Sequence, residues 1–574
     1  MNITFISESI HNSIKYKSIY FTRMRTTFLL FGIVVILPFL SGGCNRSKGI
    51  SEERRTTKIA TPSIVWIVDG MQRVKRDEPA GTGTSIELFA ARGEYEPFQI
   101  IIRAPQGGLN NVNVLAQDLT GPGGQKITKN NITLYREHYI YLSQGSSDWG
   151  GSNRPLGPGW YPEPLIPFVD PQTGQDLSGA QLDAVPFNLA ENRNQPIWVD
   201  VFVPRNVQAG QYTGTFTVTS DQGNMTTQLT LNVWDFELPL KPSFPAITQL
   251  RNAGGKEAYI ELLKHKFNPY SVGTELEREL IDDYGLVAQT TGFWSGIDYG
   301  NCNPMPPPPS LSDVQDEVKK HQIDLLLFSH YADEIEACPN IFNDVVQWAK
   351  RLREGGVKPL LPTNVIPALM GDSNENSAAD IWVVLPKMYD AYTDNINQVI
   401  QRGEEVWTYN ALVQDEYSPK WTIDFPPINF RIQPGFISQS LDVTGVQYWV
   451  FDHWTEDPWN DLTKYGNEYP GDGVFVYPGN MVGISGVAPG MRLKWIREGI
   501  EDWEYVHMLK ALGHADFALN ITRQVAPDWK NWTRSTDELY AARISLGDKI
   551  HQNSAQPLEQ SWSGFSGHQI PVYK

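Results

Sequence analysis

Residues 323–339 read IDLLLFSHYADEIEACP. A run of apolar residues stops at His330 and Tyr331, and two adjacent carboxylates, Asp333 and Glu334, follow it. A short apolar run that ends in polar residues predicts a buried strand. Two neighbouring acids repel each other, so their position directly after such a strand is informative only if the surrounding chain places the strand in a definite architecture.

The surrounding chain, from about residue 241 to residue 490, alternates apolar strands with helical patterns. Eight strands separated by helices predict a (β/α)8 barrel, and an open doubly wound sheet is the alternative. The third strand has the weakest pattern. The eight predicted strands are residues 246–250, 267–272, 286–290, 323–330, 357–362, 381–385, 405–410 and 446–452.

The segment before the barrel, residues 63–240, consists of short runs of alternating apolar and polar residues without intervening helices. This pattern predicts an antiparallel β-sandwich. Residues 144–189 interrupt it with a long stretch rich in Gly, Pro and Trp. A loop of that length inside a compact domain is usually functional or disordered, and the aromatic residues favour a functional loop.

The segment after the barrel, residues 491–574, is predicted to be helical and to pack on the barrel. It begins with MRLKWIREGIEDWEYVHML, in which Leu493, Ile496 and Ile500 mark an apolar stripe. A helix with one apolar stripe packs that stripe against the protein and leaves its charged side in water. We therefore expect an exposed side formed by Arg497, Glu498, Glu501 and Asp502.

The N-terminal stretch MRTTFLLFGIVVILPFLSGGC begins at Met24 with a positive charge, continues with an apolar core and ends in small residues before Cys44. It resembles a bacterial lipoprotein signal within residues 1–44, with Cys44 as the lipidated first residue of the mature protein and residues 45–62 as a linker. Met1 and Met24 remain alternative starts, and an uncleaved membrane anchor is the alternative to a signal. We expect a lipid-anchored protein of the bacterial cell envelope, in the periplasm or on the outer surface.

The composition excludes some classes of partner. The formal net charge is -18 and no long basic block occurs, whereas binding to a nucleic acid depends on clustered Lys and Arg. Aromatic residues make up 11% of the chain, and rings exposed in a cleft suit the C–H faces of sugars; ordinary core packing is the alternative. No metal site, cofactor loop or serine-nucleophile motif is predicted. Cys302 and Cys338 lie in predicted loops and could form a disulfide in an oxidising compartment.

The predicted barrel selects two of the five Asp-Glu dipeptides, because active-site residues of such barrels lie at the C-terminal ends of the strands. Asp333 and Glu334 follow the fourth strand, and Asp415 and Glu416 follow the seventh. Adjacent carboxylates in a partly dry cleft cannot both ionise freely, so one stays protonated as a general acid while the other stays negative. The expected substrate-binding residues around them are His330, Tyr331, Trp407, Tyr409, Trp449, Asp452, His453 and Trp454.

Several longer stretches occur in a characteristic order. They are ARGEYEPFQI and AGQYTGTF in the predicted sandwich, then YADEIEACPNIFNDVVQWAKRLREGGVKPLLPT, DIWVVLP, GEEVWTYNA, IDFPPINFRI, VTGVQYWVFDHWTEDPWND, GDGVFVYPGN and RLKWIREGIEDWEYVHML. Together they resemble glycoside hydrolase family 123 over most of the chain from about residue 63. The resemblance implies a β-sandwich followed by a catalytic barrel, and an enzyme that cleaves glycosidic bonds without a cofactor.

The resemblance also places the family's Asp-Glu pair on Asp333 and Glu334. In the characterised members, which are β-N-acetylgalactosaminidases, the acetamido group of the substrate attacks its own anomeric carbon. Carried over, Glu334 would protonate the leaving oxygen and later activate water. Asp333 would orient the acetamide and stabilise the oxazolinium-like intermediate, so no enzyme nucleophile is needed. The implied substrate is a terminal β-linked 2-acetamido sugar.

Two other functions remain open. A retaining glycosidase with an enzyme nucleophile would pair Glu334 with Glu416, with the carboxyl groups about 5–5.5 Å apart. A lipid-anchored carbohydrate-binding protein would keep the cleft and lack turnover. In each case the partner is a glycan, and contact with a membrane is expected only through the lipid on Cys44. The sugar, its linkage and the oligomeric state are left open.

Overall fold

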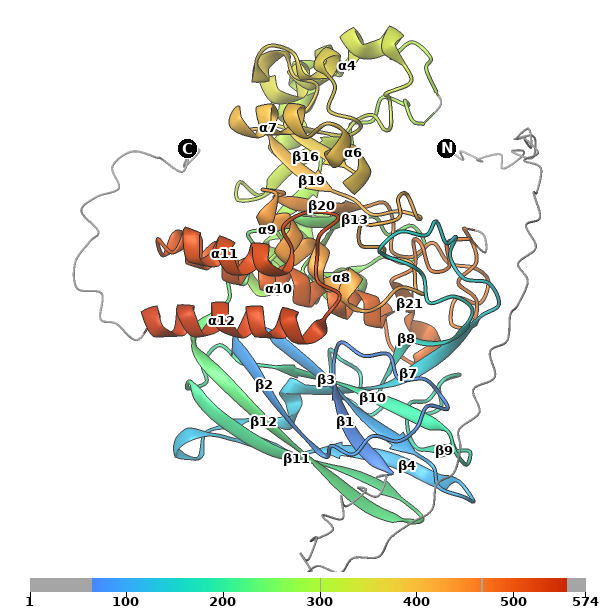
Figure 1. Ribbon diagram of the computed structural model, residues 1–574. Coiled ribbons are helices and arrows are strands. Elements are labelled where there is room, and N and C mark those ends of the chain that lie inside the picture. Colours follow the sequence, from blue (N-terminus) through green and yellow to red (C-terminus); the bar gives the residue numbers. More distant parts are fainter. Residues whose placement is uncertain (1–63, 300, 466–467, 555–574) are drawn as a thin grey trace, which may run out of the picture. The chain divides into compact units, whose positions relative to one another are not determined.

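A computed structural model describes residues 64–299, 301–465 and 468–554. The predicted signal, with Met24 and Cys44, lies outside these residues. Within them, two β-sheets come first in the chain, an eight-stranded parallel sheet follows, and three helices come last (Figure 1). The predicted fold class, a β-sandwich followed by a (β/α)8 barrel and a helical segment, is confirmed. No helix in this described part is both long enough and apolar enough to cross a bilayer.

The first two sheets are almost entirely antiparallel, and only the pairing of β2 with β12 is parallel. The five-stranded sheet has the order β1 (Val65–Asp69), β3 (Tyr95–Arg103), β10 (Asn194–Phe202), β7 (Ile132–Leu142) and β8 (Gly159–Pro167). The seven-stranded sheet has the order β2 (Ser85–Arg92), β12 (Gly223–Glu237), β11 (Gly210–Ser220), β4 (Leu109–Ala116) and β9 (Phe187–Leu189), with β5 (Leu119–Thr120) and β6 (Lys126–Ile127) beside it.

The five-stranded sheet is buried on both faces, and β10 shows why. Successive side chains of a strand point to opposite faces. Ile197 and Val199 of β10 belong to the core between the two sheets. Trp198 points the other way, where its ring lies 6.3 Å from that of Trp495 on α10 (Met491–Ala511). The sandwich is therefore joined to the C-terminal helices through a second apolar layer.

The eight predicted barrel strands are all present, and they are parallel. In sheet order they are β14 (Phe267–Pro269), β13 (Ala246–Thr248), β20 (Gly445–Tyr448), β19 (Glu405–Thr408), β18 (Ile381–Val384), β17 (Lys358–Pro362), β16 (Leu326–His330) and β15 (Ala288–Thr290). Each observed strand is shorter than its predicted range. No strand ladder joins β14 to β15, which are the two ends of this order.

Side-chain amides bridge the gap between β14 and β15. The Asn268 carboxamide oxygen accepts the N–H of Val287 at 2.8 Å. In the opposite direction, the Gln289 carboxamide oxygen accepts the N–H of Val272 at 2.8 Å and its nitrogen donates to the carbonyl of Pro269 at 3.0 Å. These bonds replace the missing ladder. They also explain the weak pattern of the third predicted strand, because a strand that uses a polar side chain for pairing lacks a continuous apolar run.

Helices connect the barrel strands, and a short hairpin precedes the C-terminal helices. The connecting helices are α1 (Lys256–Lys264), α2 (Thr274–Tyr284), α3 (Leu311–Val318), α4 (Phe342–Glu354), α5 (Pro367–Met370), α6 (Pro386–Ala391), α7 (Thr393–Gln401), α8 (Ile428–Ile432) and α9 (Ser438–Ser440). The hairpin consists of β21 (Val476–Pro478) and β22 (Val487–Pro489), and α11 (Ala515–Val525) and α12 (Thr536–Ser554) follow α10.

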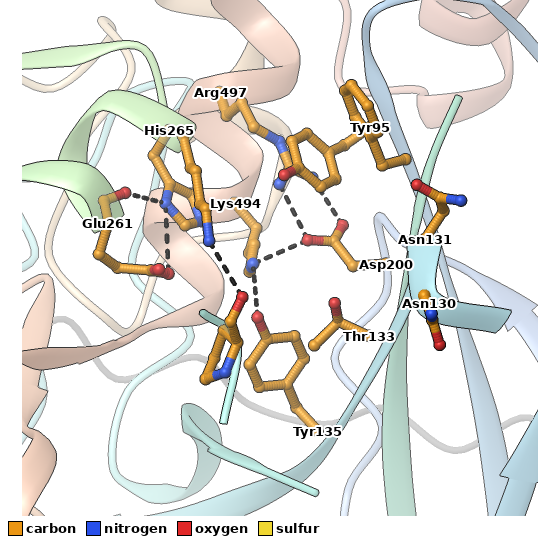
Figure 2. Close-up of a pocket in the computed structure, with 13 residues that line it drawn as sticks. Tyr95, Asn130, Asn131, Thr133, Tyr135, Asp200, Glu261, His265, Lys494 and Arg497 are labelled. Carbon is orange, nitrogen blue, oxygen red and sulfur yellow. Dashed lines mark hydrogen bonds and ion pairs between the residues drawn. The ribbon is translucent and has the colours of Figure 1, made fainter. Parts of the chain in front are cut away.

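The expected exposed side of α10 does not exist, and the prediction is wrong. Its charged residues are buried because the five-stranded sheet covers one side of the helix and α8 packs on another. Asp200 of β10 accepts from Lys494 at 2.8 Å and from Arg497 at 2.7 Å, beside a polar cavity of about 160 Å³ (Figure 2). Ion pairs between α10 and the five-stranded sheet thus compensate these charges, which solvent would do on an exposed helix. The other residues of the expected exposed side, Glu498, Glu501 and Asp502, are at most 1% exposed.

Candidate active site

A cleft of about 940 Å³ opens at the C-terminal ends of the barrel strands. All eight strands, or the residues just after them, contribute to its wall. This is the end of a (β/α)8 barrel at which active sites lie. Of the residues predicted from the sequence, the cleft is lined by His330, Asp333, Glu334, Tyr409 and Trp449.

The chain turns sharply at the carboxylate pair, which brings both side chains to the cleft. Glu334 has a φ of +43°, a left-handed conformation that is uncommon for residues other than Gly. The Glu334 N–H donates to the carbonyl of Pro362 at 2.9 Å, and the Asp333 N–H donates to that of Ile297 at 3.1 Å. Such backbone strain costs about 1–3 kcal/mol and is often found at functional sites. Strand β17 and the loop after β15 therefore hold the turn that lets two successive residues face one cavity.

The environment of Glu334 favours its protonated form. Burial, and next the negative charge of Asp333, raise the pKa of the Glu334 carboxyl group. The Tyr409 hydroxyl donates to Glu334 Oε1 at 3.0 Å, which acts in the opposite direction on that pKa. Burial and then the charge of Glu334 raise the pKa of Tyr409 well above its usual value, so this hydroxyl remains a donor. A raised pKa favours the protonated form, which is the form that general acid catalysis requires.

Asp333 is partly exposed in the same cleft and lies beside His330. Its side chain is 37% exposed, and Oδ1 lies 3.5 Å from Nε2 of His330. Asp333 and Glu334 are both partly buried, and their neighbours differ: His330 lies beside Asp333, whereas the Tyr409 hydroxyl donates to Glu334. Two neighbouring carboxyl groups in unlike environments can take separate acid and stabilising roles.

Two of the predicted substrate-binding residues are buried in the core instead. Tyr331 is fully buried, and its hydroxyl donates to the carbonyl of Ala378 at 2.6 Å. Since neighbouring side chains of an extended chain alternate, Tyr331 points away from the cleft that His330 faces. Trp407 lies in the middle of β19 and fills the barrel interior, where it packs against Gly445. Their assignment to substrate binding is corrected.

Three other predicted residues, Asp452, His453 and Trp454 in the loop after β20, are not among the residues that line the cleft. The Asp452 carboxylate accepts the backbone N–H groups of Arg251, Asn252 and Ala253, so it holds the loop that follows β13. The indole of Trp454 donates to the carbonyl of Val476 at 2.7 Å. His453 packs on Trp449, with ring centroids 5.1 Å apart. These contacts are structural, and the predicted direct contacts with substrate are not supported for Asp452, His453 and Trp454.

The second carboxylate pair is also outside the cleft lining. Asp415 is buried, and its carboxylate accepts from the Lys420 ammonium at 2.8 Å. Burial alone would raise the pKa of Asp415, but the charge of Lys420 and its hydrogen bonds lower it. Glu416 is exposed, and its backbone carbonyl accepts the N–H groups of Ser152 and Asn153. This pair therefore anchors the Gly-, Pro- and Trp-rich loop of the sandwich.

The cleft also contains residues that the sequence reasoning missed. Arg251 and Trp294 follow the first and third strands, so the rule that selected Asp333 could have found them. Gln447 lies within β20 and also faces the cleft. Asp472 is buried at the edge of the cleft and accepts from the Tyr448 hydroxyl at 2.9 Å. It lies in a loop that no strand directly precedes, so its sequence context carries no such signal. In the part of the chain that the structure describes, no three His, Cys, Asp or Glu side chains are grouped to hold a metal ion.

A disulfide joins the two loops beside the carboxylate pair. Cys302 lies in the loop after β15 and Cys338 in the loop after β16, and their Cα atoms are 5.1 Å apart. The pairing that the sequence left open is therefore present. It ties the loop that carries Trp294 to the loop that carries Asp333 and Glu334.

Comparisons with known proteins agree with this architecture. A model described as the glycoside hydrolase 123 N-terminal domain matches residues 71–220, and one described as the glycoside hydrolase 123 catalytic domain matches residues 362–509. The second match begins after Asp333 and Glu334, so it does not test their roles. A sequence comparison with curated proteins finds no match.

A solved structure of a family 123 enzyme has the same fold. A family 123 glycoside hydrolase from Clostridium perfringens, described for glycolipid glycan hydrolysis, has a TM-score of 0.57 and 14% identity, covering 85% of this chain and 97% of that chain. A β-glucuronidase from Bacteroides uniformis has a TM-score of 0.27 and 9% identity, covering 76% of this chain and 52% of its own, which is too low to support an argument. With both family domains matched in order, and with the fold of a family 123 enzyme over most of its length, the chain is a glycoside hydrolase family 123-like protein.

Proposed function

We propose that the protein hydrolyses a terminal β-linked 2-acetamido sugar, such as N-acetylgalactosamine, with retention and with the acetamido group of the substrate as the nucleophile. Glu334 is the general acid and base, and Asp333 orients the acetamide and stabilises the positive charge that develops on it. The observation that carries the proposal is the joint placement of Asp333 and Glu334 at the cleft, while Asp415 and Glu416 lie outside its lining.

The proposed roles follow from the two environments. The leaving oxygen needs a proton donor, and the raised pKa of Glu334 favours the protonated form of that carboxyl group. After the aglycone leaves, the same group as carboxylate takes a proton from water. Asp333 is open to the cleft and one residue away, so its carboxylate can accept the amide N–H of the acetamido group while the ring of the intermediate forms.

A retaining mechanism with Glu416 as the enzyme nucleophile is less well supported. It requires a second carboxylate in the cleft at about 5–5.5 Å from the acid. Glu416 does not line the cleft, and its side chain packs against Gly151 of the sandwich loop. Asp472 does reach the cleft edge, but its two oxygens accept from Leu412, Tyr448 and Trp449. A carboxylate held by three donors is a poor nucleophile.

The test is a panel of aryl β-glycosides with and without a 2-acetamido group, assayed with the parent protein and with Glu334→Gln. We expect turnover of acetamido substrates alone. Because general acid catalysis contributes about 10²–10⁴-fold, Glu334→Gln should lower kcat by that factor for poor leaving groups and by less for dinitrophenyl glycosides, which need no proton. Equal cleavage of plain galactosides by the parent would exclude substrate assistance, and full activity of Glu334→Gln would exclude the assigned acid.

Binding without turnover is distinguished by the same variant. The amide of Glu334→Gln can still accept from Tyr409, so ligand affinity should persist in both cases. A carbohydrate-binding protein would show that affinity and no hydrolysis by the parent protein. The similar Clostridium perfringens enzyme is described for glycolipid glycans, so an acetamido-terminated glycolipid headgroup belongs in the panel as a natural type of substrate.

We also propose that the protein is tethered at the cell envelope through a lipid on Cys44. The proposal rests on the sequence alone. Metabolic labelling with a fatty-acid analogue should label the parent protein and not Cys44→Ser, and the variant should leave the membrane fraction. Retention of Cys44→Ser in the membrane after a salt wash would support an uncleaved anchor instead.

A further inference from the structure

His330, the last residue of β16, is held in the wall of the cleft with one ring nitrogen unsatisfied. Its ring lies edge-on between those of Tyr270 and Trp294, with centroids 6.5 and 5.7 Å away. Nε2 is buried, has no hydrogen-bond partner among the described residues, and lies 3.5 Å from Asp333 Oδ1. That separation is long for a hydrogen bond. Catalytic hydrogen bonds are often long in a ligand-free site and shorten when substrate binds.

The other ring nitrogen of His330 faces Gln447, which comes from β20. The Gln447 amide nitrogen lies 3.4 Å from Nδ1 of His330 and also donates to the Tyr270 hydroxyl. In the orientation that the structure gives the Gln447 amide, its nitrogen faces Nδ1 of His330, so Nδ1 accepts and the ring hydrogen is on Nε2. The hydrogen bond made by one nitrogen of a histidine sets the role of the other. The contact with Gln447 therefore aims an N–H group at Asp333.

We propose that Gln447 and His330 are positioning residues for Asp333. The inference rests on the function proposed above, in which Asp333 orients the acetamido group. Gln447 selects the His330 tautomer, and the Nε2–H of His330 holds Oδ1 of Asp333 so that Oδ2 faces the substrate. A neutral donor suits this task, because it turns the carboxylate without cancelling the negative charge that must stabilise the positively charged intermediate.

A double-mutant cycle separates this role from direct contact between His330 and the sugar. The variants are His330→Phe, Asp333→Asn and their combination, assayed on an activated aryl 2-acetamido β-glycoside. If His330 acts through Asp333, His330→Phe should lower kcat by about 10–100-fold in the parent and have little effect in the Asp333→Asn background. His330→Gln, which keeps an N–H donor, should recover most of the rate and controls for loss of folding.

Gln447→Met tests whether Gln447 acts through His330. It should lower kcat in the parent and be nearly silent in the His330→Phe background. Gln414 lines the same cleft and contacts Lys387 instead, so Gln414→Met is the matched control and its effect should add to that of His330→Phe. Simple addition of the His330→Phe and Asp333→Asn losses would overturn the inference, and the proposed function would still stand if Glu334→Gln lowers kcat on a substrate with a poor leaving group. Full activity of Glu334→Gln would instead overturn the proposed function.

Discussion

The disulfide beside the carboxylate pair provides a quantitative test of how the site is held. Cys302 and Cys338 are 36 residues apart, and a cross-link of that span is worth about 4 kcal/mol at 25 °C in the chain-entropy description. The left-handed backbone at Glu334 costs about 1–3 kcal/mol, and Glu334 lies within the loop that the disulfide closes. Without the disulfide, we expect the loop to relax from the strained turn for part of the time.

The experiment compares the parent with a Cys302→Ser/Cys338→Ala variant. The chain contains 3 cysteines. Both proteins therefore carry Cys44→Ser, so that the reductant acts on the Cys302–Cys338 disulfide alone. We expect a lower thermal midpoint, and a kcat reduced by about 10–100-fold, since a displacement of about 1 Å at a catalytic group can cost 10²-fold. Reductant should bring the parent to the rate of the variant and leave the variant unchanged. Rates within twofold of the parent, with an unchanged midpoint, would refute the reasoning.

Two further predictions concern charge. The general acid works in its protonated form, so kcat/KM should fall at alkaline pH as Glu334 loses its proton. Asp333→Asn removes a charge that raises the pKa of Glu334, so it should move this alkaline fall in kcat/KM to lower pH. Tyr409→Phe removes a hydrogen bond that lowers the same pKa, so it should move the fall to higher pH. Shifts of this fall in the same direction in both variants, or no shift, would contradict the assignment. Asp200→Ala should destabilise the protein by about 3–5 kcal/mol in denaturant unfolding, because two buried cations of α10 lose their counter-charge. The control Asp316→Ala removes an exposed partner of Lys319 and should leave the stability nearly unchanged. Equal effects of the two substitutions would show that the buried pairs are not stabilising.

The charged residues around α10 and the carboxyl group of Glu334 at the cleft have different kinds of partner. Around α10, carboxylates and guanidinium groups are matched at hydrogen-bonding distance, as in the pairing of Arg431 with Asp502 at 2.7 Å. At the cleft, Glu334 accepts from a hydroxyl group, forms no ion pair with a basic side chain among the described residues, and has an acidic neighbour that raises its pKa. Matched pairs join layers, whereas the protonated form of an acid without a basic partner is favoured. The second arrangement is the one that chemistry can use.

Much of the fold followed from the sequence alone, because periodicity is a local property. Strands of period two predicted the sandwich, and alternating strands and helices predicted all eight barrel strands. The rule that barrel chemistry lies after the strands then placed His330, Asp333, Glu334, Tyr409 and Trp449 at one cleft. Side-chain direction was less predictable. Tyr331 and Trp407 have the right residue type near the right strand end, yet each packs into the core.

What only the tertiary structure decided was which polar groups are paired, buried or free. Arg497 follows Asp200 by 297 residues, and no local pattern shows that these two side chains meet. The same holds for Gln447 and His330, which are 117 residues apart and share the mouth of the barrel. Charged residues opposite the apolar stripe of a helix are exposed to solvent only when no other element packs on that side of the helix. Burial and pairing are set by contacts between distant segments, so the sequence determined the elements and the folded chain determined their electrostatics.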